Sequence, residues 1–209
     1  MPEHTYKITY FPARGLGEAS RMVLAYAKQP FEDERIDAAE LDKRRSQLPY
    51  GRLPVLTIDG KTILAESAAI ARYLAKQFGL AGKDDIEAAQ IDGVADVQKD
   101  IGAALGPFFA VASGRAQGDK EELKKTVLLP TLEKFMPLLQ KQLEASGSGF
   151  YAKSGPSWVD FFASSAVQTL KNVEPEVAAK FPFAVEHLER VNSLPQLKEY
   201  LAKRPNTPF

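Results

Sequence analysis

The chain has 209 residues, of which 44% are hydrophobic and 26% are charged, and its 27 Lys and Arg residues balance 27 Asp and Glu residues. This composition is typical of a folded globular protein with one large domain or two small ones. The zero net charge argues against nucleic-acid binding. Cysteine is absent, and the only histidines are His4 and His187. The sequence therefore excludes disulfides and cysteine nucleophiles, and it argues against a histidine metal site.

The sequence shows no targeting or membrane-spanning segment. The first residues, Met1–His4, lack the charged and apolar regions of a signal peptide. The longest uncharged stretch, 101–114, is interrupted by Gly106-Pro107 and is shorter than the roughly 20 residues that a spanning helix needs. We therefore expect a cytoplasmic protein that does not bind membranes.

The first eighty residues alternate between strand and helix patterns. Tyr6, Ile8 and Tyr10 alternate with polar residues, which predicts a half-buried strand. Asp59-Gly60 lies between two apolar, β-rich runs within 53–64, which predicts a tight hairpin. The other expected elements are a helix after the glycine turn at 14–17 that ends at Pro30, a weak edge strand at 31–37, a short polar helix or irregular loop at 38–47, and a helix from Ser67 to Gly79.

The rest of the chain shows only helical patterns after a linker at 79–84. We therefore expect two domains, an α/β domain over residues 1–80 and an all-α domain over residues 84–209. The expected helices are a long amphipathic one over 94–108, one over 128–143 that Pro130 and Pro137 kink or restart, one that begins at Ser157 with Asp160 as its capping acid, and short ones separated by Pro175, Pro182 and Pro195.

Three short motifs point to a family. They are Tyr10-Phe11, the run 48–54 (LPYGRLP) and the run 66–74 (ESAAIARYL). With the linker, the Ser157–Asp160 helix start and the Lys203-Arg204-Pro205 segment, they make the chain resemble the soluble glutathione transferases from end to end. It is most similar to the sigma class, which includes prostaglandin D synthase. The resemblance implies a thioredoxin-like α/β domain followed by an all-α domain, a homodimer, and glutathione as co-substrate.

Tyr10 is the residue that the resemblance identifies as catalytic. Spacing alone favours a tyrosine that merely packs in its strand. An ordinary thiol has a pKa of about 8.5, so the thiol of glutathione is mostly protonated at pH 7 and is a poor nucleophile. A tyrosine hydroxyl beside the sulfur can donate a hydrogen bond to the thiolate and lower the pKa of that thiol. The N-terminus of the following helix also favours an anion there.

The resemblance also implies a binding wall for the peptide backbone of glutathione. Leu53 offers backbone groups to the cysteinyl part, and the Leu53–Pro54 bond is cis. Glu66 and Ser67 begin a helix whose unpaired N–H groups suit the γ-glutamyl carboxylate, although Ser67 is also typical of a plain N-cap. Glu66 stands where many relatives carry Gln, and it can accept a hydrogen bond from the γ-glutamyl ammonium. The wall is completed by Gly51 and Arg52.

Three positions matter because of what relatives carry there. Arg45 lies in the basic run 43–45, which alone is typical of a solvated face, and it matches the family position that meets the glycyl carboxylate. Leu41 lies where many sigma members carry Trp, so it offers contact without a hydrogen bond. Leu16 lies where many relatives carry Arg beside the catalytic tyrosine. We therefore expect thiolate stabilisation to depend on Tyr10, with Arg14 as a candidate helper.

An acidic stripe is the next feature with two interpretations. Asp92, Asp96 and Asp100 are four residues apart, which indicates a solvated helix face. The resemblance implies instead that Asp100 reaches the glutathione of the neighbouring subunit. Prostaglandin D synthase binds a divalent metal with acids in this region, but Lys99 replaces one of them here, so we expect no metal. Tyr50 is a candidate for the subunit interface.

The electrophile site is the least specific expectation. Phe11, Ala104, Phe108 and Phe209 are candidates for lining an apolar site, although such residues at helical spacing are more often core. We expect a detoxifying transferase that conjugates glutathione to apolar electrophiles or reduces organic hydroperoxides. Two alternatives stay open: a non-catalytic ligand-binding or crystallin-like structural member, and a glutathione-dependent prostaglandin isomerase. The isomerase is disfavoured because Trp158, the only tryptophan, belongs to a helix start.

Overall fold

The computed structural model describes residues 4–209, so the start of the predicted first domain and most of the segment tested for a signal peptide lie outside the described residues. A four-stranded sheet has the order β2-β1-β3-β4. β1 and β2 are parallel, whereas β3 is antiparallel to both of its neighbours. The predicted strands are confirmed, with the charged strand at an edge: β1 (Tyr6–Tyr10), β2 (Phe31–Arg35), β3 (Val55–Ile58) and β4 (Thr62–Ala65).

The strand register brings four chain segments to one edge of the sheet. Tyr10, the last residue of β1, lies beside Arg35 at the end of β2. The preceding Thr9 lies opposite Val55, where β3 begins, and Val55 lies opposite Ala65, where β4 ends. The chain therefore leaves β1, β2 and β4 and enters β3 at the same side of the sheet. We call this row of strand ends the site edge; it is distinct from the outer strands β2 and β4.

The opposite edge carries the predicted hairpin. Asp59 and Gly60 both have positive φ, 53° and 66°, as a type I′ turn requires. The Asp59 carboxylate also accepts a hydrogen bond from the Thr5 N–H at 2.8 Å and lies 2.7 Å from His4 Nδ1. These bonds tie the residues before β1 to the hairpin, far along the strands from the site edge.

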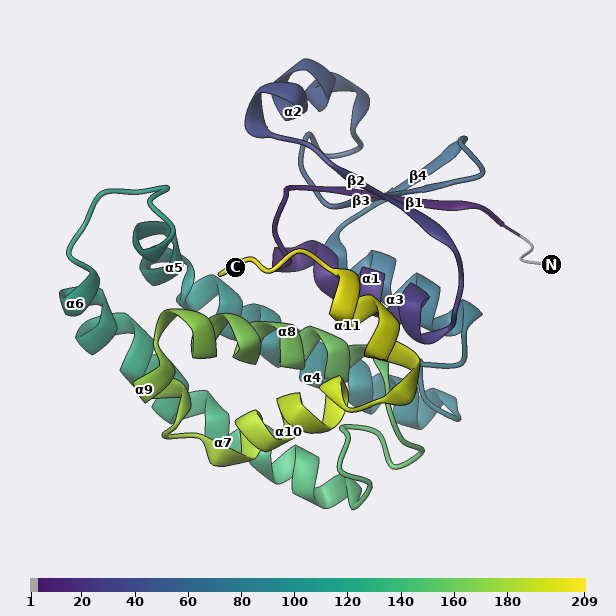
Figure 1. Cartoon of the computed structure of the whole chain (residues 1–209). Coiled ribbons are helices and arrows are strands. Elements are labelled where there is room, and N and C mark those ends of the chain that lie inside the picture. Colours follow the sequence, from purple (N-terminus) through teal and green to yellow (C-terminus); the bar gives the residue numbers. More distant parts are fainter. Residues whose placement is uncertain (1–3) are drawn as a thin grey trace.

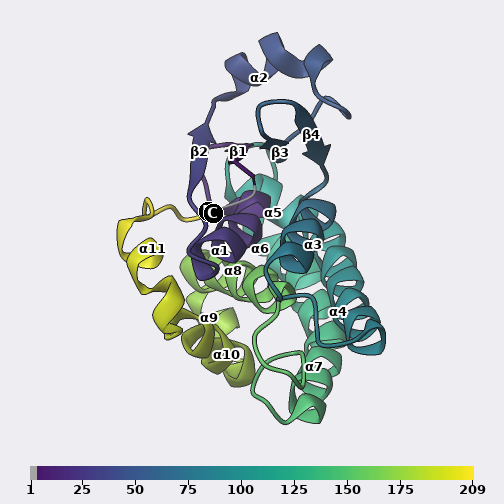
Figure 2. The same cartoon turned by 90° about the vertical axis from the view of Figure 1, so that its right-hand side faces the viewer.

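Three helices complete the α/β domain: α1 (Glu18–Tyr26), α2 (Ala38–Arg44) and α3 (Ser67–Gln77). α1 and α3 cover the face of the sheet that is turned toward the remaining helices, whereas α2 lies on the other side (Figure 1; Figure 2). The helical alternative for 38–47 is confirmed, since α2 is followed by a 3-10 turn at Arg45–Gln47. Residues 78–84 join α3 to the next helix, and we propose this segment as the division between domains 1–80 and 84–209.

The second half of the chain is mostly helical, which confirms the expected fold class. Among residues 4–209, no helix is both long and apolar enough to cross a membrane. The helices are α4 (Asp85–Ala104), α5 (Gly106–Ala112), α6 (Lys120–Leu123), α7 (Leu129–Ser146), α8 (Trp158–Val173), α9 (Pro175–Ala178), α10 (Pro182–Asn192) and α11 (Lys198–Lys203), with a π-helical turn at Lys124–Leu128.

The helix expected over 94–108 is wrong in one respect, because it breaks at Leu105. α4 ends at Ala104, and α5 begins with Pro107 in its first turn. A proline lacks an N–H and clashes with the carbonyl four residues before it, so it is tolerated at a helix start rather than inside. Pro130 likewise lies in the first turn of α7, whereas α7 continues through Pro137 without a restart.

The predicted start of α8 is confirmed and lies deep in the core. The Asp160 carboxylate accepts hydrogen bonds from the Ser157 N–H at 2.8 Å and the Ser157 hydroxyl at 2.7 Å. It also accepts one from the Tyr151 N–H at 2.9 Å and lies 2.8 Å from His187 Nε2. The buried carboxylate therefore has several hydrogen-bond partners, as a buried polar group requires, and it ties the start of α8 to α10 and to the residues before the helix.

Candidate active site

A small apolar cluster at the site edge brings several predicted residues together. Its buried members are the side chains of Tyr10, Ile36, Leu41, Leu53 and Val55, and Phe11, Leu48 and Ala65 pack against them. It is separate from the large core cluster that joins the two halves of the molecule. Four residues that the resemblance singled out, namely Tyr10, Phe11, Leu41 and Leu53, thus lie in one group.

The hydroxyl of Tyr10 is held by the turn that follows β1. The backbone N–H of Leu16 donates a hydrogen bond to the Tyr10 oxygen at 3.1 Å. This bond uses an acceptor position of the hydroxyl and leaves its own proton free for another acceptor. The Leu16 side chain is 50% exposed beside it, so the position offers a backbone donor and an apolar surface in place of a guanidinium.

Gly15 and Gly17 allow this approach because neither carries a Cβ. A Cβ at Gly15, whose φ is +39°, would lie 2.6 Å from the Tyr10 hydroxyl oxygen. One at Gly17 would lie 3.0 Å from the ring. The sequence predicted only a glycine-containing turn here. Two glycines five and seven residues after a strand tyrosine do not by themselves indicate close contact with its ring; the fold is needed to show it.

Arg21 is a second buried neighbour of Tyr10 that sequence reasoning missed. Its guanidinium carbon lies 5.7 Å from the centre of the Tyr10 ring, a cation–π distance. The same group forms ion pairs with Asp33 at 2.8 Å and Glu18 at 3.4 Å, and it donates to the Ala13 carbonyl at 2.9 Å. The helical pattern around Met22 and Val23 gave no reason to expect a buried arginine among apolar residues.

Arg14 does not point toward the Tyr10 hydroxyl. Its guanidinium donates to the Pro208 carbonyl at 2.9 Å, the Thr169 hydroxyl at 3.2 Å and the Ser165 carbonyl at 3.4 Å. Burial and the nearby Arg204 lower the pKa of Arg14 from its ordinary value. The suggestion that Arg14 helps to stabilise the thiolate is therefore not supported, because its donors are used against α8 and the end of the chain.

The residues before β3 present backbone groups at the site edge. The Leu53–Pro54 peptide bond is cis, as the resemblance implies. Among the described residues, neither the N–H nor the carbonyl of Leu53 forms a backbone hydrogen bond. Arg45 approaches from the turn after α2, where it donates to the Gly51 carbonyl at 2.7 Å and to Asp42 at 2.6 Å. A peptide ligand could pair with Leu53 here and meet the Arg45 guanidinium at its acidic end.

Glu66 and Ser67 stand at the start of α3, on the same edge. Glu66 has φ of +71°, a conformation that costs a non-glycine residue free energy and is often found at functional sites. Its carboxylate accepts a hydrogen bond from Arg52 Nε at 2.8 Å. Ser67 is the first residue of α3, where the N–H groups of the first turn have no partner within the helix. This end of the site can therefore bind both an anionic and a cationic group.

Other predicted residues are not gathered around Tyr10. Phe108 is completely buried in the large core cluster, in edge contact with Phe109 at a centroid distance of 5.3 Å. This burial favours a core role for Phe108, and its place in the electrophile site stays a prediction. Ala104 and Asp100 are exposed on α4, outside the small cluster. Within residues 4–209, no three His, Cys, Asp or Glu side chains form a group that could hold a metal ion.

The fold and the site edge together define a class of two-domain proteins. In this class a small α/β domain carries a tyrosine and a cis-proline loop, and a helical domain follows it. The family description "Glutathione S-transferase, N-terminal domain" matches residues 6–76, and "Glutathione S-transferase, C-terminal domain" matches residues 105–204. The chain belongs to the glutathione S-transferase family and is a transferase enzyme.

Three similar proteins illustrate this relationship. Glutathione S-transferase 1 of Ascaris suum is 40% identical over 209 residues, which cover 100% of each chain. The solved structure of Na-GST-3, a monomeric glutathione S-transferase of Necator americanus, is 39% identical, with a TM-score of 0.92, and the match covers 98% of this chain and 100% of that one. Prostaglandin synthase D of Nilaparvata lugens is 33% identical, with a TM-score of 0.86, and the match covers 97% and 100%.

Proposed function

We propose that the enzyme activates the thiol of glutathione through the Tyr10 hydroxyl. The observation that carries this proposal is the hydrogen bond from the Leu16 N–H to the Tyr10 oxygen at 3.1 Å. Because the hydroxyl accepts there, its proton is available to the sulfur of a bound glutathione. Accepting one bond also polarises the hydroxyl and strengthens the bond that it donates. The thiolate form of glutathione is then favoured, and the pKa of its thiol falls.

We propose that the rest of glutathione lies along the site edge. The cysteinyl backbone pairs with the free backbone groups of Leu53, beside Pro54. The glycyl carboxylate meets Arg45, with Gly51 and Leu41 forming the adjacent surface. The γ-glutamyl group binds at the start of α3, where the Ser67 N–H and hydroxyl donate to its carboxylate and Glu66, held by Arg52, accepts from its ammonium.

In the proposed reaction, the thiolate sulfur attacks the electrophilic carbon of an apolar substrate. With an aryl halide, a carbon–sulfur bond forms, the halide leaves with the bonding electrons, and the thiol proton passes to solvent. With an organic hydroperoxide, a first thiolate attacks the peroxide oxygen, and a second glutathione then completes a disulfide as the alcohol and water are released. Phe11 and the exposed Leu16 side chain supply apolar surface next to the sulfur.

The decisive experiment is chlorodinitrobenzene conjugation by the wild-type enzyme and by Tyr10→Phe. We expect Tyr10→Phe to bind glutathione with nearly the same affinity and to lose about 10²-fold in kcat, the usual effect of removing one oriented donor. An unchanged kcat between pH 6 and 8 would contradict the proposal. A wild-type protein that binds glutathione but does not turn over would indicate the non-catalytic, ligand-binding alternative.

A second candidate activity is prostaglandin isomerisation, because one similar structure is named a prostaglandin synthase. Trp158 is completely buried in the large core cluster and cannot stack on such a substrate. We therefore propose conjugation as the main activity. Incubation with prostaglandin H2 and glutathione tests this choice, since a specific isomer product formed as fast as the chlorodinitrobenzene conjugate would favour the isomerase.

We further propose a cytosolic, sigma-class homodimer that needs no metal. Tyr50 is 66% exposed in the single chain, which suits a side chain inserted into a partner subunit, and Asp100 is exposed on α4, where it could reach the glutathione of that subunit. Analytical ultracentrifugation of wild type and Tyr50→Ala tests the assembly. A wild-type monomer, as named for Na-GST-3, would contradict it, and activation by Mg²⁺ would contradict the metal-free site.

A further inference from the structure

The C-terminal tail, which we define as residues Arg204–Phe209, lies against the turn that holds Tyr10. It leaves α11 and runs back over α8 to the start of α1 (Figure 1). The turn itself is Gly15–Gly17, whose Leu16 N–H bonds the Tyr10 hydroxyl. The residues that flank this turn on either side, Arg14 and Glu18, are both bound by the tail.

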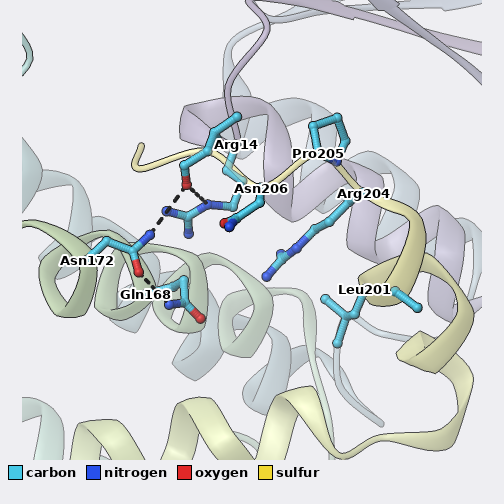
Figure 3. A pocket seen from close by; sticks show the side chains of 9 residues that line it. Arg14, Gln168, Asn172, Leu201, Arg204, Pro205 and Asn206 are labelled. Carbon is cyan, nitrogen blue, oxygen red and sulfur yellow. Dashed lines mark hydrogen bonds between the residues drawn. The ribbon is translucent and has the colours of Figure 1, made fainter.

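Arg14 is bound by the far end of the tail. Its backbone N–H donates to the Phe209 carbonyl at 2.9 Å. Its guanidinium donates to the Pro208 carbonyl at 2.9 Å and to the Thr207 carbonyl at 3.4 Å. Asn172 of α8 donates to the same two carbonyls, at 3.2 and 3.4 Å. Figure 3 shows Arg14 and Arg204 converging on the space between α8 and the tail.

Glu18 is bound by the near end of the tail. The Arg204 guanidinium donates to the Glu18 carboxylate at 2.6 Å, and Glu18 is completely buried. The second Glu18 oxygen pairs with Arg21, whose guanidinium lies beside the Tyr10 ring. A charge-assisted hydrogen bond to a buried acid is among the stronger side-chain contacts. Both ends of the Gly15–Gly17 turn are therefore fixed by residues nearly two hundred positions away.

We propose that the C-terminal tail is a positioning element for Tyr10: by fixing Arg14 and Glu18 it holds the Leu16 N–H on the Tyr10 hydroxyl. This inference rests on the proposed role of Tyr10. Among the described residues, no side chain of the tail forms a hydrogen bond with the Tyr10 hydroxyl or with a residue of the site edge. Its effect is to keep the donor proton aimed at the sulfur, so its loss acts on the thiol pKa rather than on glutathione binding.

The test is a chain that ends at Pro205, compared with the full chain in chlorodinitrobenzene conjugation at saturating glutathione from pH 6 to 9. We expect the midpoint of the kcat–pH profile, which reports the thiol in the bound complex, to rise by about one unit. That shift lowers the thiolate fraction about tenfold at pH 6.5 and much less at pH 9. The KM for glutathione should change less than about threefold, since the binding wall is untouched.

Two results would overturn the proposal. One is an unchanged kcat–pH profile; the other is a loss of kcat of equal size at every pH, which indicates general damage. If the shortened chain does not fold, the double substitution Thr169→Val and Asn172→Ala decides, because it removes the Thr169 contact of Arg14 and the Asn172 contacts of the tail carbonyls while keeping the tail and the bond from Arg14 to the Ser165 carbonyl. The same upward shift is expected there, smaller in size, and an unshifted profile overturns the proposal.

One matched control lies in the tail and another in the last residue of α11 before it. Asn206→Ala alters a tail side chain with no hydrogen bond to Arg14 or Glu18 among the described residues, and Lys203→Ala removes only an exposed ion pair with Glu199. Both should keep the wild-type profile. The tail proposal fails, and the proposed function stands, if the full chain conjugates chlorodinitrobenzene, Tyr10→Phe does not, and the shortened chain behaves as wild type. If Tyr10→Phe behaves as wild type, the proposed function itself fails.

Discussion

The two apolar clusters of the molecule differ in size and in what they support. The large one joins the α/β domain to the helical domain and completely buries aromatic side chains such as Trp158, Phe108 and Phe161. The small one has five buried members at the site edge. Arg44, on the same helix as Leu41, forms ion pairs with Glu34 and Glu40. We therefore expect the first cluster to contribute more to folding, and the second to contribute mainly to the proposed glutathione site.

Phe108→Ala should produce the largest loss of stability. The ring is completely buried, so its removal should cost about 3–5 kcal/mol of unfolding free energy, from lost burial and the cavity left behind. The fraction that stays folded should keep its kcat. Urea unfolding and conjugation assays measure the two effects. A loss of activity at unchanged stability would instead return Phe108 to the electrophile site.

Leu41→Ala should lose less stability than Phe108→Ala and should affect glutathione binding more. It removes a buried side chain from the small cluster, and we expect a cost of about 2 kcal/mol, the lower end for such substitutions, because the loop before it can close in. The KM for glutathione should rise with little change in kcat, as for a contact made equally in ground and transition states. Equal losses in stability for Leu41→Ala and Phe108→Ala would remove the distinction between the clusters.

Gly15→Ala isolates the contact with Tyr10, and Gly114→Ala is its matched control. Both glycines have positive φ, +39° and +74°, but a Cβ at Gly114 would meet nothing within 4 Å. Each substitution should cost about 1–2 kcal/mol for the left-handed backbone. Only Gly15→Ala should also lower kcat, because its Cβ displaces the Tyr10 hydroxyl. Unimpaired kcat in Gly15→Ala would show that the hydroxyl position is not critical.

The ion pairs of Glu174 should produce the smallest effect, which is present at neutral pH and lost in acid. Burial alone would raise the pKa of this carboxyl, but hydrogen bonds from Lys120 and Lys124 outweigh it and hold the pKa below its ordinary value of 4.5. A lowered pKa in the folded state adds stability above about pH 4.5, which is lost as the pH falls through the folded value. We expect a contribution of about 1 kcal/mol or less. Substituting both lysines by Met should lower the urea midpoint by more at pH 7 than at pH 3; an equal loss at both pH values would contradict the assignment.

The parts of the fold that follow from local rules could be predicted from the sequence. The Asp59-Gly60 hairpin, the Ser157–Asp160 helix start and the prolines that begin α9 and α10 each depend on residues close together in the chain. The break at Leu105 was missed because periodicity continues across it, although Pro107 marked the position. Local sequence signals thus predict the helices and strands well and predict the breaks within them less well.

The site was predictable only in part, for a physical reason. The family motifs placed Tyr10, Leu41 and Leu53 correctly in one region, but their roles toward glutathione stay predictions. Residues that act through long-range packing carry no local signal: Arg14 bonds to residues more than 150 positions away, and Arg21 is buried within an ordinary helical pattern. A phenylalanine at helical spacing is the same in sequence whether it lines a site or fills a core, which is why the sequence could not decide between these two roles for Phe108.

The two ends of the described chain are bonded to different parts of the α/β domain. Thr5 is bonded to the hairpin at the edge away from Tyr10, whereas Phe209 is bonded to Arg14 beside the Gly15–Gly17 turn. Recombinant versions should therefore tolerate a fusion partner at the N-terminus far better than one at the C-terminus. If the tail positions Tyr10 as proposed, an affinity tag joined after Phe209 should disturb the Gly15–Gly17 turn, and a preparation purified that way should show a lower turnover than the untagged enzyme.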